Sequence, residues 1–143
     1  MSDDSFDQLK LRVEELRPSS IIDVAPRRSA DPRESVDLFV TSLGFTGIGE
    51  GWKPLSQDEA ASLLFRVLER NQAFSNSFEM EAEDATSLVV DFMKCAGPAD
   101  FFTNGSFEEF GWGGHRVTGA TCETGVIWVN KKTVGWLWVC DED

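Results

Sequence analysis

Residues 125–143 read GVIWVNKKTVGWLWVCDED and contain two short apolar runs separated by residues 130–133. Both runs are rich in valine and tryptophan, residues that favour β-strands. A loop of two or four residues between the runs pairs Val129 with Val134 and Trp128 with Gly135. We therefore expect a β-hairpin in which the indole ring of Trp128 covers a glycine on the neighbouring strand.

Both faces of this hairpin are apolar, because side chains alternate between the two faces of a strand. One face is predicted to carry Val126, Trp128, Leu137 and Val139. The other face is predicted to carry Ile127, Val129, Val134, Trp136, Trp138 and Cys140. A hairpin with one face in water alternates with polar residues. We therefore expect either a central hairpin covered on both faces, or one with a face left for a partner.

Most of the chain before Pro98 consists of helix signals, with a capping residue, an apolar stripe and a stop. The first predicted helix starts at a Ser5–Gln8 capping box and ends at Pro18, and the second starts at Asp31 and ends at Gly44. The third starts at a Ser56–Glu59 capping box and carries its apolar stripe to Leu68, and the fourth runs from about Glu81 to Ala96. Segments 17–32 and 44–54 are expected to be connections. After Pro98, Asn104-Gly105 predicts the turn of a further hairpin.

These elements predict an α+β fold. About four N-terminal helices pack on a C-terminal antiparallel sheet that ends in the tryptophan-rich hairpin. A chain of 143 residues has the usual size of one domain, so we expect a single domain over residues 1–143.

The chain is strongly acidic, with 25 acidic and 13 basic residues and a net charge of −12. Residues 1–70 carry 9 basic and 13 acidic residues (net −4), and residues 71–143 carry 4 and 12 (net −8). Such a field also serves solubility, but it repels nucleic acids and anionic membranes and attracts basic proteins. There is no apolar run of about 20 residues and no signal-peptide pattern, which predicts a cytoplasmic protein without a membrane partner.

Residues suited to catalysis or metal binding are few. The cysteines Cys95, Cys122 and Cys140 are widely spaced, which predicts free thiols rather than a zinc site. The glycine-rich segments lack the patterns of nucleotide-binding loops. We therefore expect no enzyme activity, cofactor or metal. A small enzyme that uses His115 with Cys122 or a carboxylate is the minor alternative.

A partner-binding surface is the stronger expectation, because tryptophan dominates binding hot spots and carboxylates attract basic partners. The candidate partner-binding residues are Glu50, Trp52, Glu108, Glu109, Trp112, Asp141, Glu142 and Asp143. The acidic tail is also a way to protect the end of a strand from aggregation.

In size, charge and its tryptophan-rich hairpin, the chain resembles bacterial immunity proteins of contact-dependent growth inhibition and polymorphic toxin systems. This resemblance implies a cytoplasmic inhibitor that binds a toxin domain and occludes its active site. For a nuclease toxin with a basic cleft, carboxylates would replace substrate phosphates and a tryptophan would fill a pocket. The alternative is a regulatory adaptor that binds another basic protein.

Overall fold

The computed structural model describes residues 3–74, 76–105, 107–108, 111–112 and 114–142, with the backbone alone at residues 3, 107–108 and 111–112. The helices are α1 (Asp3–Leu16), α2 (Pro32–Ser42), the short 3₁₀ helix η1 (Gly49–Gly51), α3 (Gln57–Glu69) and α4 (Ala82–Ala96). The strands are β1 (Ser20–Pro26), β2 (Lys53–Leu55), β3 (Asp100–Thr103), β4 (Phe107–Glu108), β5 (Gly111–Trp112), β6 (Cys122–Val129) and β7 (Thr133–Asp141).

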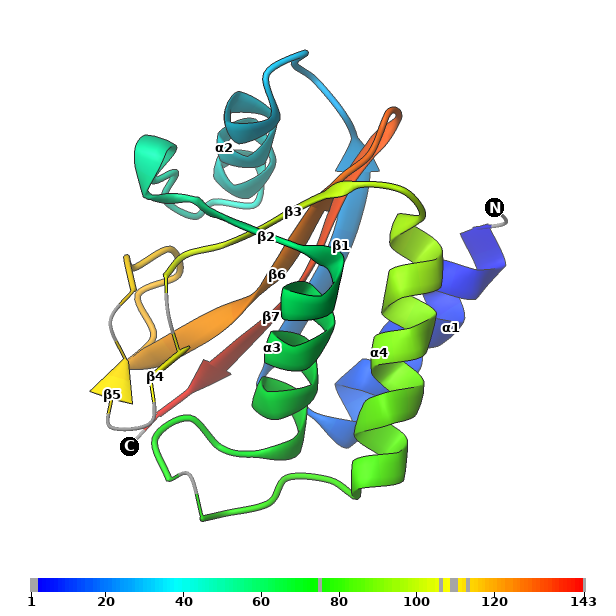
Figure 1. Cartoon of the computed structure of the whole chain (residues 1–143), viewed down its shortest axis with the longest axis vertical. Coiled ribbons are helices and arrows are strands. Elements are labelled where there is room, and N and C mark those ends of the chain that lie inside the picture. The colour runs from blue at the N-terminus through cyan, green and yellow to red at the C-terminus, as the bar shows by residue number, and fades with distance from the viewer. Residues whose placement is uncertain (1–2, 75, 106, 109–110, 113, 143) are drawn as a thin grey trace.

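The predicted α+β fold is confirmed. Five strands form one antiparallel sheet in the order β1-β7-β6-β3-β2, and β4 pairs with β5 in a separate ribbon. Figure 1 shows α1, α3 and α4 on one side of the sheet and α2 on the other. In the described part of the chain, no helix combines the length and the apolar character needed to cross a membrane.

The hairpin β6–β7 has the register expected from the sequence, with Val129 opposite Val134 and Trp128 opposite Gly135. A Cβ atom placed on Gly135 would lie 2.2 Å from Cζ2 of Trp128. The indole ring therefore occupies the space that a side chain at Gly135 would need. The two predicted faces of the hairpin are also confirmed, because their residues fall into two separate buried clusters.

The first cluster lies between the sheet and α1, α3 and α4. Its centre is Trp128, which is fully buried. The ring of Phe6 from α1 meets the indole edge-on at 6.2 Å between centroids, and the ring of Phe92 from α4 does so at 5.0 Å. Edge-on aromatic pairs add to the burial energy, so these contacts fix two helices on the sheet.

The second cluster is covered by α2 and by the loop that carries Trp52. The Oδ1 atom of Asp37 on α2 accepts hydrogen bonds from the backbone N–H groups of Ile48 and Gly49 and from Nε1 of Trp52, the last at 2.7 Å. This carboxylate folds the loop back onto the sheet, where the Trp52 ring lies edge-on to Trp138 at 6.1 Å. The chain therefore covers the second hairpin face itself, and that face is not left for a partner.

Helix starts were predicted well where a side chain caps the backbone. Asp31 accepts a hydrogen bond from the N–H group of Glu34, and Ser56 and Glu59 form both bonds of a capping box. The predicted start at Ser5 is wrong, because α1 already includes Asp3 and Ser5 lies inside the helix.

Two other predictions are corrected by the pairing of the strands. Segment 17–32 is not only a connection, because residues 20–26 form the edge strand β1. Asn104-Gly105 is not a hairpin turn, because β3 pairs with β2 and β6 rather than with β4. Asn104 is buried instead, and its Nδ2 atom donates to the carbonyl oxygens of His115 and Glu123 at 2.7 and 3.1 Å.

Replacing Gly135 by alanine is expected to lower the free energy of unfolding by about 3 kcal/mol, because the new methyl group collides with a fully buried indole. Urea denaturation measures this change. The control is Gly51→Ala, where the nearest atoms belong to the exposed ring of His115, which can move. The control should stay within about 0.5 kcal/mol of the unchanged protein. Equal effects at the two glycines would contradict this account of the hairpin.

Candidate functional site

The end of the sheet is held by a buried ion pair between Arg17 and Asp141. Nη1 and Nη2 of Arg17 donate to the two carboxylate oxygens of Asp141 at 2.8 and 2.9 Å. The Arg17 and Asp141 side chains are 1% and 2% exposed. Two parallel hydrogen bonds between charged groups make this a strong and directional contact. It joins the end of α1 to the end of β7.

The remaining hydrogen-bonding groups of this pair bring α3 and the following loop to the same point. Arg17 donates to the carbonyl oxygens of Val67, Leu68 and Arg70, at the carbonyl end of α3, where a helix favours a cation. The Oδ2 atom of Asp141 accepts from the backbone N–H group of Gln72 at 2.8 Å and from its Nε2 atom at 3.1 Å. The loop after α3 is therefore attached directly to the buried carboxylate.

The described residues of this loop are also held by hydrogen bonds within the segment and to the end of α3. Oδ1 of Asn71 accepts from the N–H groups of Ala73 and Phe74, and the N–H group of Asn71 donates to the carbonyl of Ser77. The N–H group of Glu79 donates to the carbonyl of Glu69 at 2.7 Å, which closes the loop at its base. The segment is irregular in outline, but hydrogen bonds hold it at several points.

Two aromatic side chains of this loop lie in solvent. Phe74 is 56% exposed and Phe78 is 61% exposed. The guanidinium of Arg70 lies 4.8 Å above the Phe78 ring and 3.4 Å from the carboxylate of Glu69, so the ring is held in place while it remains accessible.

Carboxylates follow immediately in the chain. Glu81 and Glu83 are exposed, whereas the Glu79 side chain is 29% exposed and its Oε1 atom lies 3.6 Å from Nη1 of Arg17. We refer to Phe74, Phe78, Glu79, Glu81 and Glu83 as the acid–aromatic surface. A hollow beside it is lined by Leu16, Glu69, Phe78, Glu79, Met80, Glu81, Ala82 and Asp84. Two of its four carboxylates, Glu69 and Glu79, already pair with Arg70 and Arg17. The apolar side chains, together with Glu81 and Asp84, suit a long basic side chain, whose stem is apolar and whose end is charged.

The structure corrects two of the predicted partner-binding residues. Trp52 is fully buried between α2 and the sheet, because Asp37 draws its indole N–H inward. Asp141 is buried because it pairs with Arg17. Neither side chain can reach a partner in this structure.

Of the other predicted residues, two are described and exposed, and the side chains of four lie outside the described residues. Glu50 is exposed on η1, and Glu142 is exposed and accepts hydrogen bonds from Thr121. The side chains of Glu108, Glu109, Trp112 and Asp143 lie outside the described residues, so the predictions for them stay predictions. The missed signal was a pair of phenylalanines in the polar segment 71–79, where neither helical nor strand periodicity calls for a core residue.

The possible catalytic residues do not come together in the described part of the chain. The His115 side chain is exposed and lies against Gly51. Cys122 sits opposite Asp141 on the neighbouring strand, and the Sγ atom of Cys140 lies 3.5 Å from the hydroxyl of Thr118. Among the described residues, no group of three or more histidine, cysteine or acidic side chains is arranged to hold a metal ion.

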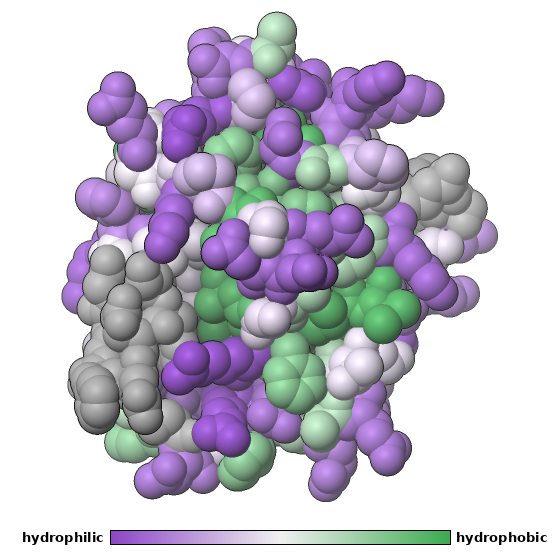
Figure 2. All heavy atoms as spheres, in the orientation of Figure 1, coloured by the Kyte–Doolittle hydropathy of each residue, from purple (hydrophilic) through white to green (hydrophobic). Residues whose placement is uncertain are grey.

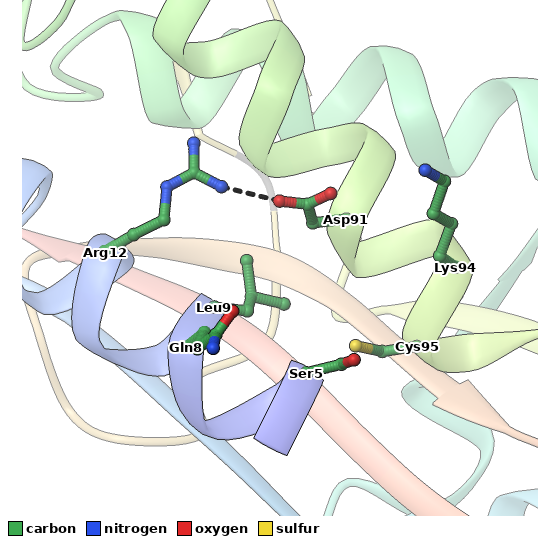
Figure 3. Close-up of a pocket in the computed structure, with 7 residues that line it drawn as sticks. All are labelled: Ser5, Gln8, Leu9, Arg12, Asp91, Lys94 and Cys95. Carbon is green, nitrogen blue, oxygen red and sulfur yellow. Dashed lines mark hydrogen bonds and ion pairs between the residues drawn. The ribbon is translucent and has the colours of Figure 1, made fainter. Parts of the chain in front are cut away.

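A second hollow lies between α1 and α4, and its side chains are shown in Figure 3. Arg12 donates to Asp91 and to the hydroxyl of Ser87, so its charge is already matched. Burial, followed by the nearby charge of Asp91, raises the pKa of the Cys95 thiol at the same hollow. A raised pKa keeps the thiol protonated, which makes it a poor nucleophile.

Comparisons with protein-family models, with curated proteins and with solved structures find no match for this chain.

Replacing Asp141 by asparagine is expected to lower the free energy of unfolding by about 3–5 kcal/mol, because Arg17 would stay buried with only the longer contact to Glu79, at 3.6 Å, as an opposite charge. The matched control is Asp23→Asn, which breaks the half-exposed pair with Lys10 at 3.2 Å and should cost at most about 1 kcal/mol. Urea denaturation of both variants compares the two costs. A small effect of Asp141→Asn would show that the buried pair does not hold this end of the sheet.

The thiols Cys95 and Cys140 are expected to react slowly with iodoacetamide at neutral pH. Burial raises the pKa of both above the ordinary value of 9.0, so the reactive thiolate forms only at higher pH. Mass spectrometry of the folded protein across a pH series should show alkylation at these positions rising above about pH 9. The same series in urea provides the control, and equal rates in the folded and unfolded chains would contradict the prediction.

Proposed function

We propose that this chain is an acidic protein-binding protein that neutralises a basic toxin domain, in the manner of an immunity protein. The observation that carries the proposal is the acid–aromatic surface, in which Phe74 and Phe78 stand in solvent on an anchored loop next to exposed carboxylates. Aromatic anchors surrounded by polar residues are characteristic of binding hot spots. Two exposed rings in one short loop have no role in the core of this fold.

The charge of the surface points to the kind of partner. The chain carries a net charge of −12, which draws basic proteins toward it and raises their rate of association. In a nuclease, the substrate cleft is basic because it binds phosphates. Glu81 and Glu83 would occupy such a cleft in place of phosphates. The two phenylalanines take the anchoring role that the sequence had suggested for tryptophan.

The test begins with capture of the partner from the native organism by the tagged, full-length chain at low and at high salt. The proposal requires one stoichiometric basic protein that binds more weakly at high salt and loses its toxic activity in the complex. A nuclease assay of the captured protein, with and without the chain, measures that loss. A captured partner without toxic activity would favour the regulatory adaptor, and no stoichiometric partner would refute both.

Replacing Phe74 and Phe78 together by alanine is expected to weaken binding of that partner by at least about 100-fold, because both anchors are lost. The fold should be unaffected, since both rings lie in solvent. Isothermal titration calorimetry measures the affinity, and Leu11→Ala is the control, because Leu11 is 67% exposed on α1. An equal loss with the control would show that the acid–aromatic surface is not the binding site.

The carboxylates are expected to act on the rate of association. Glu81→Gln with Glu83→Gln should slow binding several-fold at low salt and flatten its salt dependence. Glu14→Gln with Glu15→Gln on α1 changes the net charge by the same amount at another exposed place. Stopped-flow kinetics compare the two pairs, and indistinguishable rates would mean that overall charge, not this surface, directs the encounter.

A further inference from the structure

A hollow between α3 and α4 lies at the edge of the first buried cluster, which includes Val89 and contacts Ala61 and Phe65. Figure 1 shows the two helices side by side and running in opposite directions. The hollow between them is lined by Ala61, Ser62, Phe65, Thr86, Val89 and Val90. Val90 is 45% exposed, although its side chain is apolar. We refer to this hollow and its continuation below as the α3–α4 groove.

The groove continues into the hollow beside the acid–aromatic surface. Ala61, Phe65 and Glu69 follow one another at four-residue intervals on one side of α3, and Ala82 and Thr86 do the same on α4. Figure 2 shows hydrophobic side chains gathered on this face between hydrophilic ones. The two hollows share no lining residue, but the four-residue spacing places them one after the other along the line where α3 meets α4.

The two ends of the groove differ in chemistry. The end near Ala61 and Val90 is apolar, whereas the end near Glu69, Glu81 and Asp84 carries carboxylates. From Ala61 to Glu69 is eight residues of helix, or about 12 Å along the groove. A ligand that fits has an apolar stripe of that length with positive charge at one end.

We propose that the α3–α4 groove binds an amphipathic helix of a partner protein. Apolar side chains of that helix lie on Phe65, Val89 and Val90, and an arginine or lysine at one end of the stripe reaches the carboxylates. Helices commonly bind in apolar grooves of this kind through residues spaced three and four apart. In a helix lying along α3, a basic residue eight positions beyond the first apolar contact would lie near these carboxylates.

The charge of the groove distinguishes this occupant from a second copy of the chain. Two copies would bring two net charges of −12 together, and the carboxylate end of each groove would find no excess of positive charge. A basic helix is attracted to the chain and brings positive charge to the carboxylate end of the groove. The inference rests on the proposed function for the identity of the partner, because the helix would belong to the same basic protein.

The test uses the full-length chain labelled with ¹⁵N and a designed helical peptide of about 14 residues, long enough to be helical in an alanine-rich sequence. The peptide carries leucines spaced three and four apart and two arginines at one end of the same face. Titration followed by NMR should shift backbone signals of α3 and α4. A second peptide, with glutamates in place of the arginines, should bind at least about tenfold more weakly.

A pair of variants locates the binding. Val90→Lys places a charge in the groove and should weaken binding of the arginine peptide at least about tenfold. Val24→Lys is the matched control, because Val24 is 37% exposed on β1 and its replacement by lysine changes the net charge by the same amount. Thermal unfolding of both variants verifies that they fold. Equal weakening by the two variants, shifts outside α3 and α4, or no binding of the arginine peptide would overturn the inference.

The peptide test and the capture experiment fail independently. Peptide binding in the groove without a toxic partner would leave the groove assigned and refute the proposed function. Inhibition of a toxic partner that is unchanged by Val90→Lys would support the function and overturn the groove as its binding site.

Discussion

The buried ion pair between Arg17 and Asp141 joins parts of the chain that are 124 positions apart. Burying two charges costs several kcal/mol, which is recovered only when their hydrogen-bonding groups are satisfied. Carbonyl groups of α3 and the amide of Gln72 provide these partners. The end of the sheet, the end of α3 and the start of the loop with Phe74 and Phe78 therefore meet at one point. The exposed surface depends on a contact that no partner can touch.

A second constraint comes from the hairpin β6–β7, which is apolar on both faces. Three helices cover the face of Trp128, whereas among the described residues the opposite face is covered by α2, the loop that carries Trp52, and Val117. The carboxylate of Asp37 helps to cover this second face, because it holds the loop against the sheet and places Trp52 in the core. The same sequence features that suggested an exposed tryptophan, a loop with glycines and an acid nearby, are what allow the ring to be buried.

The sequence predicted the elements whose causes are local. Helix caps at Asp31 and Ser56, and the register of β6 on β7, depend on neighbouring residues, so they could be read directly. The strand β1 was missed because its edge position tolerates Pro26 and an irregular pattern. Asp141 was misjudged for a different reason. Its partner Arg17 is distant in the chain, and no local pattern distinguishes a buried carboxylate from a solvated one.

The position of Phe74 and Phe78 has a consequence for binding. A loop that is mobile in the free protein loses conformational entropy when a partner orders it, and this loss weakens the complex. Here Asn71, Gln72 and Glu79 already fix the backbone, and Arg70 already holds the Phe78 ring. Part of that entropic cost would therefore be met during folding. This arrangement is what the proposed binding role requires of the two exposed rings.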